Sequence, residues 1–326
     1  MNTFSISIDC EDLRDKSPDQ YNLYDCKVRQ GAMGIPRLLE IFDQLAVKAT
    51  FFVDVYNVQK RISTSSLKSL CNLIVHSGHE IGLHTHPEKA RSNNSHLFDS
   101  PVGYLADYDR HEQFQLLDYG KKRLEDWTGV SITTHRGGSY SINRHTLELL
   151  NTLGFKTDAS IFWPALHYDF VPPDKQNLLN PFMLNGIIEV PVSCFLLTFL
   201  AGKRISVAKK IDINWSTKKE ILKAQKKIKC HVDIFLHSYS LFNVSRGKLN
   251  KYFTDSLTVA ISEVKKERRN ITINQIKPEE EIQTIPEISL FSSIISPDEF
   301  MNIYLPKMSL KKIRKHLSKS RTITSA

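Results

Sequence analysis

The sequence predicts an α/β protein built around a parallel β-sheet. Short apolar runs with strand periodicity alternate with stretches of helical periodicity, and acids or histidines follow several of the strand-like runs. The 326 residues include 41% apolar residues and only 13 Gly and 13 Pro, enough for one large domain or two smaller ones. Alternation over this length indicates a sheet that is either doubly wound or closed as a barrel.

The first part of the chain repeats a strand–helix unit. In the run FSISI, the side chains of Phe4, Ile6 and Ile8 share one face, as in a strand. Ser5 and Ser7 share the opposite face, and the next periodic runs continue the alternation. We expect strands at residues 4–8, 49–53 and 78–84, and helices at about 35–45 and 65–76.

The second part continues the pattern after an irregular stretch. In a last helix from about residue 252, Leu257, Ile261 and Val264 are spaced for one buried face. Because the pattern weakens after Asn270, we predict a main domain over residues 1–270 and an extension over residues 271–326. The other expected elements are helices at about 108–127, 143–153 and 217–229, strands at 131–135, 155–160, 187–197 and 231–241, and a Pro-rich connection at 171–181.

The net charge of +9 lies mostly at the C-terminal end. After Glu299 the chain has no acid and seven Lys or Arg residues, which leaves +2 for residues 1–299. This nearly neutral body argues against a nucleic-acid-binding surface. In the basic tail, Leu310, Ile313 and Leu317 fall on one helical side, which suits an anionic membrane surface, although a disordered solubilising tail is an equal alternative.

Other features of the sequence concern location. No apolar run reaches the roughly 18 residues of a membrane span, and the first residues lack the basic and apolar regions of a signal peptide. The five cysteines are scattered without paired spacings, so we expect reduced, mostly buried thiols. We therefore expect a cytoplasmic protein, with peripheral contact at the inner face of the membrane left open.

Candidate metal ligands follow two of the predicted strands. Asp9, Glu11 and Asp12 end the first strand, where acids commonly cap a helix or lie in solvent. His84 and His86 end another strand, and such a pair alone is more often part of a surface loop. Because the carboxyl ends of parallel strands gather at one edge, these residues together offer two nitrogen ligands and one oxygen ligand. The combination predicts a metal site.

Two further strand ends carry basic residues. HRGGSY places Arg136 beside Gly137 and Gly138, so that the arginine can hold an acid ionised while the glycines allow close backbone approach. The alternative is a glycine turn with an ordinary surface arginine. FLHSYSL places His237 at a strand end as a candidate general acid, although a lone histidine in an apolar strand is more often simply packed.

Taken in order, these strand ends resemble the polysaccharide deacetylase family, carbohydrate esterase family four, whose domain is called the NodB-homology domain. The similarity runs from about Phe4 to Leu241. SIDCED resembles the acidic first motif of the family, KATFFV its second strand, and GHEIGLHTHPE its metal-histidine motif. HRGGSY resembles the arginine motif, TDASIFW the aspartate/tryptophan motif and IFLHS the last histidine motif.

The resemblance implies a distorted, incomplete (β/α) barrel of about seven parallel strands, TIM-like in arrangement, over residues 1–270. It implies one divalent metal, with zinc favoured and cobalt or manganese as alternatives. The implied enzyme is a carbohydrate deacetylase, a hydrolase acting on carbon–nitrogen bonds other than peptide bonds, which removes an N-acetyl or other acyl group from a sugar.

Site roles follow from the resemblance residue by residue. Asp9 matches the catalytic base, Arg136 the residue that fixes this base, and His237 the general acid. Further matches fall where the family contacts the substrate or the oxyanion, the last two with looser spacing: Tyr140, Asp158 and Trp163.

Two departures from the family pattern leave the metal ligands open. The family has two adjacent aspartates in its first motif, whereas here Glu11 and Asp12 both follow Cys10. We favour Glu11, because residues i and i+2 of a strand point the same way. The family places its histidines four residues apart, but this chain has Glu88 at that position, so either His86 or Glu88 completes the site. We favour His86.

The expected cytoplasmic location favours an intracellular substrate. We expect a precursor in surface polysaccharide or lipopolysaccharide (O-antigen) biosynthesis, such as a nucleotide-linked or lipid-linked acetylated sugar, and no nucleic acid as a partner. One alternative is a catalytically inactive carbohydrate-binding relative, because the first two motifs are atypical. The other is a two-histidine, one-carboxylate iron oxygenase, although such enzymes usually take these ligands from a β-sandwich.

Overall fold

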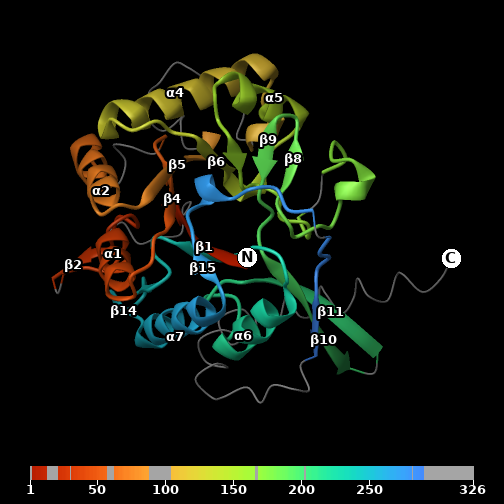
Figure 1. The fold of residues 1–326 in the computed structure, drawn as a ribbon. Helices are drawn as coiled ribbons and strands as arrows, with labels where there is room; N and C mark the ends of the chain where they lie inside the picture. The colour runs from red at the N-terminus through yellow and green to blue at the C-terminus, as the bar shows by residue number, and fades with distance from the viewer. Residues whose placement is uncertain are drawn as a thin grey trace.

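A curled parallel sheet forms the centre of the molecule (Figure 1). The computed structural model describes residues 2–12, 21–29, 31–56, 62–87, 104–165, 168–201, 203–280 and 282–289, without the side chains of 199–201 and 203–205. Seven strands run parallel in the order β12–β1–β4–β5–β6–β7–β9, which confirms the predicted incomplete (β/α) barrel. Antiparallel β8 extends this path, and the short β15 pairs with β1.

The strands of this sheet are β1 (Thr3–Cys10), β4 (Thr50–Asp54), β5 (Glu80–Thr85), β6 (Thr134–Gly137), β7 (Thr157–Asp158), β8 (Phe182–Leu184), β9 (Ile187–Glu189), β12 (Val232–His237) and β15 (Arg269–Asn270). Two small hairpins, β2 (Lys27–Val28) with β3 (Gly31–Ala32) and β13 (Phe242–Asn243) with β14 (Lys248–Leu249), lie in loops outside it.

The α-helices of the described residues surround the sheet (Figure 1). The helix ends fall within two residues of the predicted ends, because the residues that start and stop a helix lie next to it in the sequence. In one such signal, Asp109 accepts a hydrogen bond from the Glu112 N–H at 2.8 Å, and Glu112 accepts one from the Asp109 N–H at 3.0 Å. The helices are α1 (Ile35–Gln44), α2 (Thr64–His76), α4 (Arg110–Thr128), α5 (Arg144–Thr152), α6 (Lys218–Lys227) and α7 (Lys251–Glu267).

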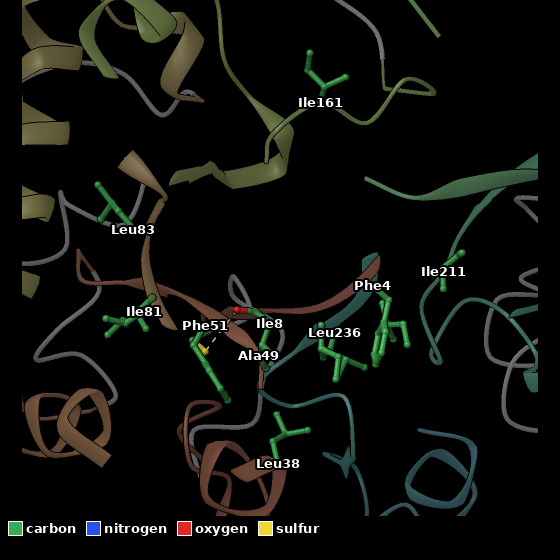
Figure 2. Close-up of a cluster of buried hydrophobic side chains, with 14 of the residues drawn as sticks. Phe4, Ile8, Leu38, Ala49, Phe51, Ile81, Leu83, Ile161, Ile211 and Leu236 are labelled. Atoms are coloured by element: carbon green, nitrogen blue, oxygen red, sulfur yellow. Dashed lines mark hydrogen bonds between the residues drawn. The ribbon is translucent and has the colours of Figure 1, made fainter. Parts of the chain in front are cut away.

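Strand β1 is buried on both of its faces. Its apolar face packs outward against the helices, and Figure 2 shows Ile8 close to Leu38 of α1. Its polar face points to the barrel interior, where the hydroxyls of Ser5 and Ser7 donate to the carboxylate of Asp233 on β12 at 2.6 and 2.5 Å. The serine face that alternates with the apolar one is therefore part of a buried polar network.

A separate three-stranded sheet was not predicted from the sequence. The run 187–197, expected to be one strand, divides into β9 and β10 (Cys194–Ala201), and β10 forms a long hairpin with β11 (Lys203–Lys210). Pro191 lies between the two parts and has no N–H for a strand ladder, which explains the break. The hairpin projects away from the barrel in Figure 1 and also pairs with β16 (Glu287–Ser289).

Residues 271–280 and 282–289 include side chains that pack against the main body. Ile271, Ile273 and Ile276 are buried in a cluster with Phe52 of β4, and Ile288 of β16 is also buried. The division at residue 270 remains a prediction, and the basic tail lies outside the described residues. Among the described residues, no helix has the length and apolar character needed to cross a membrane. All five cysteines are buried, and none forms a disulfide within the described residues.

We expect stability to fall in acid partly because of His231. Its ring is buried and bonded to the hydroxyls of Thr3 and Ser5 at 2.8 and 2.9 Å. Burial, and secondarily Arg268, lowers the pKa of His231 from 6.5 to about 3. The unfolded chain therefore binds this proton more readily, so the contribution is complete above about pH 6.5 and is lost as the pH falls toward the folded pKa.

At pH 5 this loss amounts to about 2 kcal/mol relative to pH 7. Urea unfolding of the wild type and of His231→Gln at both pH values measures it, since glutamine keeps hydrogen-bonding groups but does not titrate. The free energy of unfolding should fall less in the variant, by about that amount. Equal falls in the two proteins would show that His231 does not contribute.

Candidate active site

Several of the predicted strand ends meet at one edge of the barrel. The parallel register places Asp9 of β1 beside His237 of β12, and His84 of β5 beside Arg136 of β6. Parallel strands bring their carboxyl ends to the same edge, which is why residues far apart in sequence converge here. A cavity of about 430 Å³ opens at this edge, and Asp9, Glu11, His84, His86 and His237 are among the residues that line it.

Glu11, His84 and His86 form a group that could hold a metal ion, with one ligand atom of each within 4.8 Å of the others. The Nε2 atoms of the two histidines are 3.1 Å apart, and Glu11 Oε2 is 2.5 Å from His86 Nε2 and 3.8 Å from His84 Nε2. Two imidazoles and one carboxylate are a donor set that suits zinc and other divalent transition metals. The residues present therefore fit a divalent ion, with the cavity beside them for water or substrate.

The other two candidate ligands are not part of this group. Asp12 is buried, but its carboxylate does not join the three ligand atoms. Glu88 lies outside the described residues. The arrangement supports the preference for Glu11 and His86.

Hydrogen bonding orients the first histidine. His84 is fully buried, and its Nδ1–H donates to the carbonyl of Arg136 at 2.9 Å, which leaves Nε2 with a lone pair directed at the group. Burial, opposed by Asp9, lowers the pKa of His84, so the neutral form that binds metal is favoured.

Gly138 packs directly beneath the second histidine. A Cβ added at Gly138 would lie 2.5 Å from His86 Nδ1 and 2.6 Å from the Thr85 carbonyl, distances that real Cβ atoms essentially never show. The His86 ring would have to move, and its Nε2 would leave the group. A glycine is needed here because the His86 ring lies too close to leave room for a Cβ. Close approach to the backbone was the role expected for Gly137 and Gly138.

We expect Gly138→Ala to weaken zinc binding by roughly 10- to 100-fold, the range seen when groups that orient metal ligands are altered. Competition with a fluorescent chelator measures the affinity. Gly129→Ala is the control: its added Cβ would meet nothing within 4 Å, so it strains the backbone without touching the site. Unchanged zinc affinity in Gly138→Ala would contradict the packing argument.

Asp9 is held as a carboxylate by Arg136. Its Oδ1 accepts a hydrogen bond from Arg136 Nη1 at 2.9 Å, and its Oδ2 lies 3.7 Å from His84 Nε2. Burial alone would raise the pKa of Asp9, but His84 and Arg136 lower it below its ordinary value. A buried carboxylate that stays ionised beside the ligand group is suited to accept a proton.

Arg136 is fixed on every side. Its guanidinium carbon lies 4.4 Å from the ring centre of Phe52 and 5.1 Å from that of Phe235, and its Nε donates to the Ala159 carbonyl at 2.9 Å. Asp233 approaches Nη2 at 3.4 Å. Although burial would lower it, Asp9 and Asp233 raise the pKa of Arg136, so its charge is retained.

His237 and Tyr140 complete this side of the cavity. His237 Nε2 is 3.7 Å from Glu11 Oε1, and its ring stacks on Tyr239 with centroids 5.0 Å apart. Burial, opposed by Glu11 and Asp9, lowers the pKa of His237. Ser139 and Tyr140 both have left-handed backbone angles, with φ of 54° and 63°. Two consecutive residues in this conformation are costly and are typical of functional sites.

The structure does not bring Asp158 and Trp163 to the cavity. Asp158 is buried and lies 2.6 Å from the ring of His135, whose proton it can accept, and it also accepts from the Ser160 hydroxyl. The indole N–H of Trp163 donates to the Leu178 carbonyl. Both side chains therefore make contacts within the barrel body.

Other cavity-lining residues were given no role from the sequence, although Ser139 lies in HRGGSY and Tyr239 and Ser240 lie in FLHSYSL. Several come from the unpredicted hairpin or from the loops after β11 and β12, which meet the site only through long-range packing. They are Ser139, Lys210, Asn214, Trp215, Tyr239, Ser240, Phe242 and Phe253.

Comparisons with known proteins support the family resemblance. Residues 25–157 match the family model described as polysaccharide deacetylase. A curated peptidoglycan deacetylase of Helicobacter pylori is 30% identical over 142 residues, 44% of this chain and 40% of the relative. The chain thus matches about two fifths of that relative's length. The matched range contains His84, His86 and Arg136, whereas Asp9 and Glu11 precede it.

A solved structure resembles the fold over more of the chain than the sequence matches cover. A candidate polysaccharide deacetylase of Mycobacterium smegmatis superposes with a TM-score of 0.51 at 16% identity, over 86% of this chain and 94% of that one. The overlap agrees with the curled half-barrel and its α/β layers. At this identity the likeness concerns the fold alone.

Proposed function

We propose, because residues 25–157 match the polysaccharide deacetylase family model, that this chain is a metal-dependent hydrolase that removes an N-acetyl or other acyl group from a sugar. The observation that carries the proposal is the grouping of Glu11, His84 and His86 in a cavity that Asp9 also lines, with the buried Arg136 paired to Asp9. Five side chains from three strand ends then serve one reaction centre.

A divalent ion held by Glu11, His84 and His86 would polarise the acyl carbonyl and supply water of lowered pKa. Asp9 takes the proton of the attacking water, a role worth about 10²- to 10⁴-fold in rate. Arg136 keeps this carboxylate ionised before the attack and holds its orientation through the bond to Oδ1. The rigid aromatic packing of Arg136 limits any movement of the pair.

His237 is proposed as the acid that protonates the leaving nitrogen. Its ring lines the cavity, with Nε2 3.7 Å from Glu11 Oε1, and its imidazolium form would carry the proton that it donates. The backbone N–H of Tyr140 is proposed to donate to the developing oxyanion, since preorganised donors are usually the largest source of rate enhancement. The left-handed backbone at Ser139 and Tyr140 would direct this N–H.

We propose zinc as the ion, with cobalt and manganese as alternatives, since histidine and carboxylate ligands accept all three. The substrate is proposed to be a nucleotide-linked or lipid-linked acetylated sugar, an intracellular precursor in surface polysaccharide or O-antigen assembly. Residues 1–270 would form the catalytic domain. A cytoplasmic location with contact between the basic tail and the inner membrane face is part of the same proposal.

The test is acetate release by the full chain from N-acetylated chitooligosaccharides and from a nucleotide-linked N-acetyl sugar. Treatment with a strong chelator should remove the activity, and added zinc, cobalt or manganese should restore it. Glycan binding without acetate release would favour an inactive relative. Oxygen-dependent turnover would favour an oxygenase, and chelator-resistant acetate release would contradict the metal role.

A further inference from the structure

A lysine reaches the candidate active site from the hairpin outside the barrel. Lys210 is the last residue of β11 and lines the same cavity as the ligand group. The mechanism proposed above does not use it. A positively charged side chain that lines the cavity but takes no part in the reaction is a candidate for binding the substrate.

The contacts of Lys210 are mostly uncharged. Its Nζ donates to the Tyr140 hydroxyl at 2.6 Å and lies 4.1 Å from the ring centre of Phe235. Within the described part of the chain, no carboxylate lies within the 4.0 Å ion-pair distance of Nζ. Burial, opposed first by Asp212, lowers the pKa of Lys210. The protein therefore surrounds this cation with aromatic faces and leaves it without a close ion pair.

An exposed aromatic ring lies near this amine. Trp215 has half of its surface exposed, lines the cavity, and has its ring centre 6.0 Å from Lys210 Nζ. An exposed indole beside a polar cavity provides a flat apolar face that suits the face of a sugar ring. A sugar resting on Trp215 would have its substituents within reach of Lys210.

We propose that Lys210 and Trp215 form a subsite for an anionic sugar, in which Lys210 binds a carboxylate or phosphate group near the acyl-bearing position. The inference rests on the proposed deacylation and narrows its substrate class to acetylated glycans with a negative charge. The anion replaces the water around a partly buried ammonium group, which has no ion pair of its own to lose. Lysine binds such groups as a point charge, so either anion fits.

The test compares kcat/KM of the wild type and Lys210→Met on three substrates. Triacetylchitotriose is neutral, uridine diphosphate N-acetylglucosamine carries phosphate, and a disaccharide containing N-acetylmuramic acid carries a carboxylate. The variant should lose roughly 10- to 100-fold on one or both anionic substrates, chiefly through KM, as expected for a hydrogen bond to a charged group. It should lose less than about 3-fold on the neutral substrate. The substrate with the larger loss identifies the anion.

Two further variants separate binding from positioning. Tyr140→Phe removes only the phenol oxygen that Lys210 contacts, so it should lower kcat/KM by similar factors on all three substrates. Lys210→Arg retains the charge and should restore most of the preference for anions. Equal losses by Lys210→Met on charged and neutral substrates would show that Lys210 only positions Tyr140, and would overturn the subsite.

Binding measurements distinguish this inference from the proposed function. Saturation-transfer NMR with uridine diphosphate N-acetylglucosamine and with the muramic-acid disaccharide does not require turnover. If the wild type releases no acetate but Lys210→Met binds either compound more weakly than the wild type does, the anion subsite is retained and the deacetylase is rejected. Acetate release with no preference for charge would reject the subsite and retain the deacetylase.

Discussion

Replacing His84 by alanine is expected to lower both zinc content and acetate release by more than about 100-fold, beyond the loss that follows when a ligand is only misoriented. His84 is completely buried, and its Nε2 is one of the three grouped ligand atoms. Without it, Glu11 and His86 provide only two ligands, too few for a stable site. Metal analysis of the purified variant and the chelator-sensitive rate measure the two losses.

His76→Ala is the matched control, because His76 is an exposed histidine at the end of α2. It should keep the zinc content and rate of the wild type. Circular dichroism and thermal melting show whether His84→Ala remains folded. A folded His84→Ala protein with full zinc content and full activity would rule out the proposed centre.

Asp9→Asn is expected to lower kcat by about 10²- to 10⁴-fold, the usual range for loss of a general base. The amide keeps the shape of the carboxylate and can still accept a hydrogen bond from Arg136, but it cannot take a proton from water. Zinc content should change little, since Asp9 is not in the ligand group. Loss of rate with retained metal distinguishes this variant from His84→Ala.

Asp255→Asn on α7 provides the control, because this side chain is 60% exposed and forms an ion pair with Lys251 on the same helix. Its rate should equal that of the wild type. Steady-state kinetics at saturating substrate, with metal content measured on the same samples, gives the comparison. Full kcat in Asp9→Asn would show that another group accepts the proton.

The main features of the barrel could be predicted because they are local in the sequence. Apolar runs such as FSISI and KATFFV have strand periodicity, and parallel order then brings their ends together. Strand order alone therefore predicts that Asp9, His84 and His237 lie at one edge of the sheet. The choice of Glu11 over Asp12 depended on side-chain direction just beyond β1, which a pattern alone leaves open.

The hairpin and its contribution to the site could not be predicted in this way. Lys210 contacts Tyr140, 70 residues earlier in the chain, and no local pattern encodes that contact. The segment TDASIFW shows the reverse case. Its sequence resembles a family motif, but its Asp158 and Trp163 side chains do not line the cavity. Asp158 pairs with His135 and Trp163 with Leu178, contacts that depend on neighbouring strands and loops.

The most direct test of the proposed centre is an anomalous-scattering map from crystals of the full chain grown with zinc. We expect one peak about 2.0–2.2 Å from Glu11 Oε2 and from the Nε2 atoms of His84 and His86. A peak coordinated by Asp12 in place of Glu11 would change the ligand assignment. A peak that touches neither histidine, or no peak at this edge of the barrel, would contradict the metal centre and the mechanism built on it.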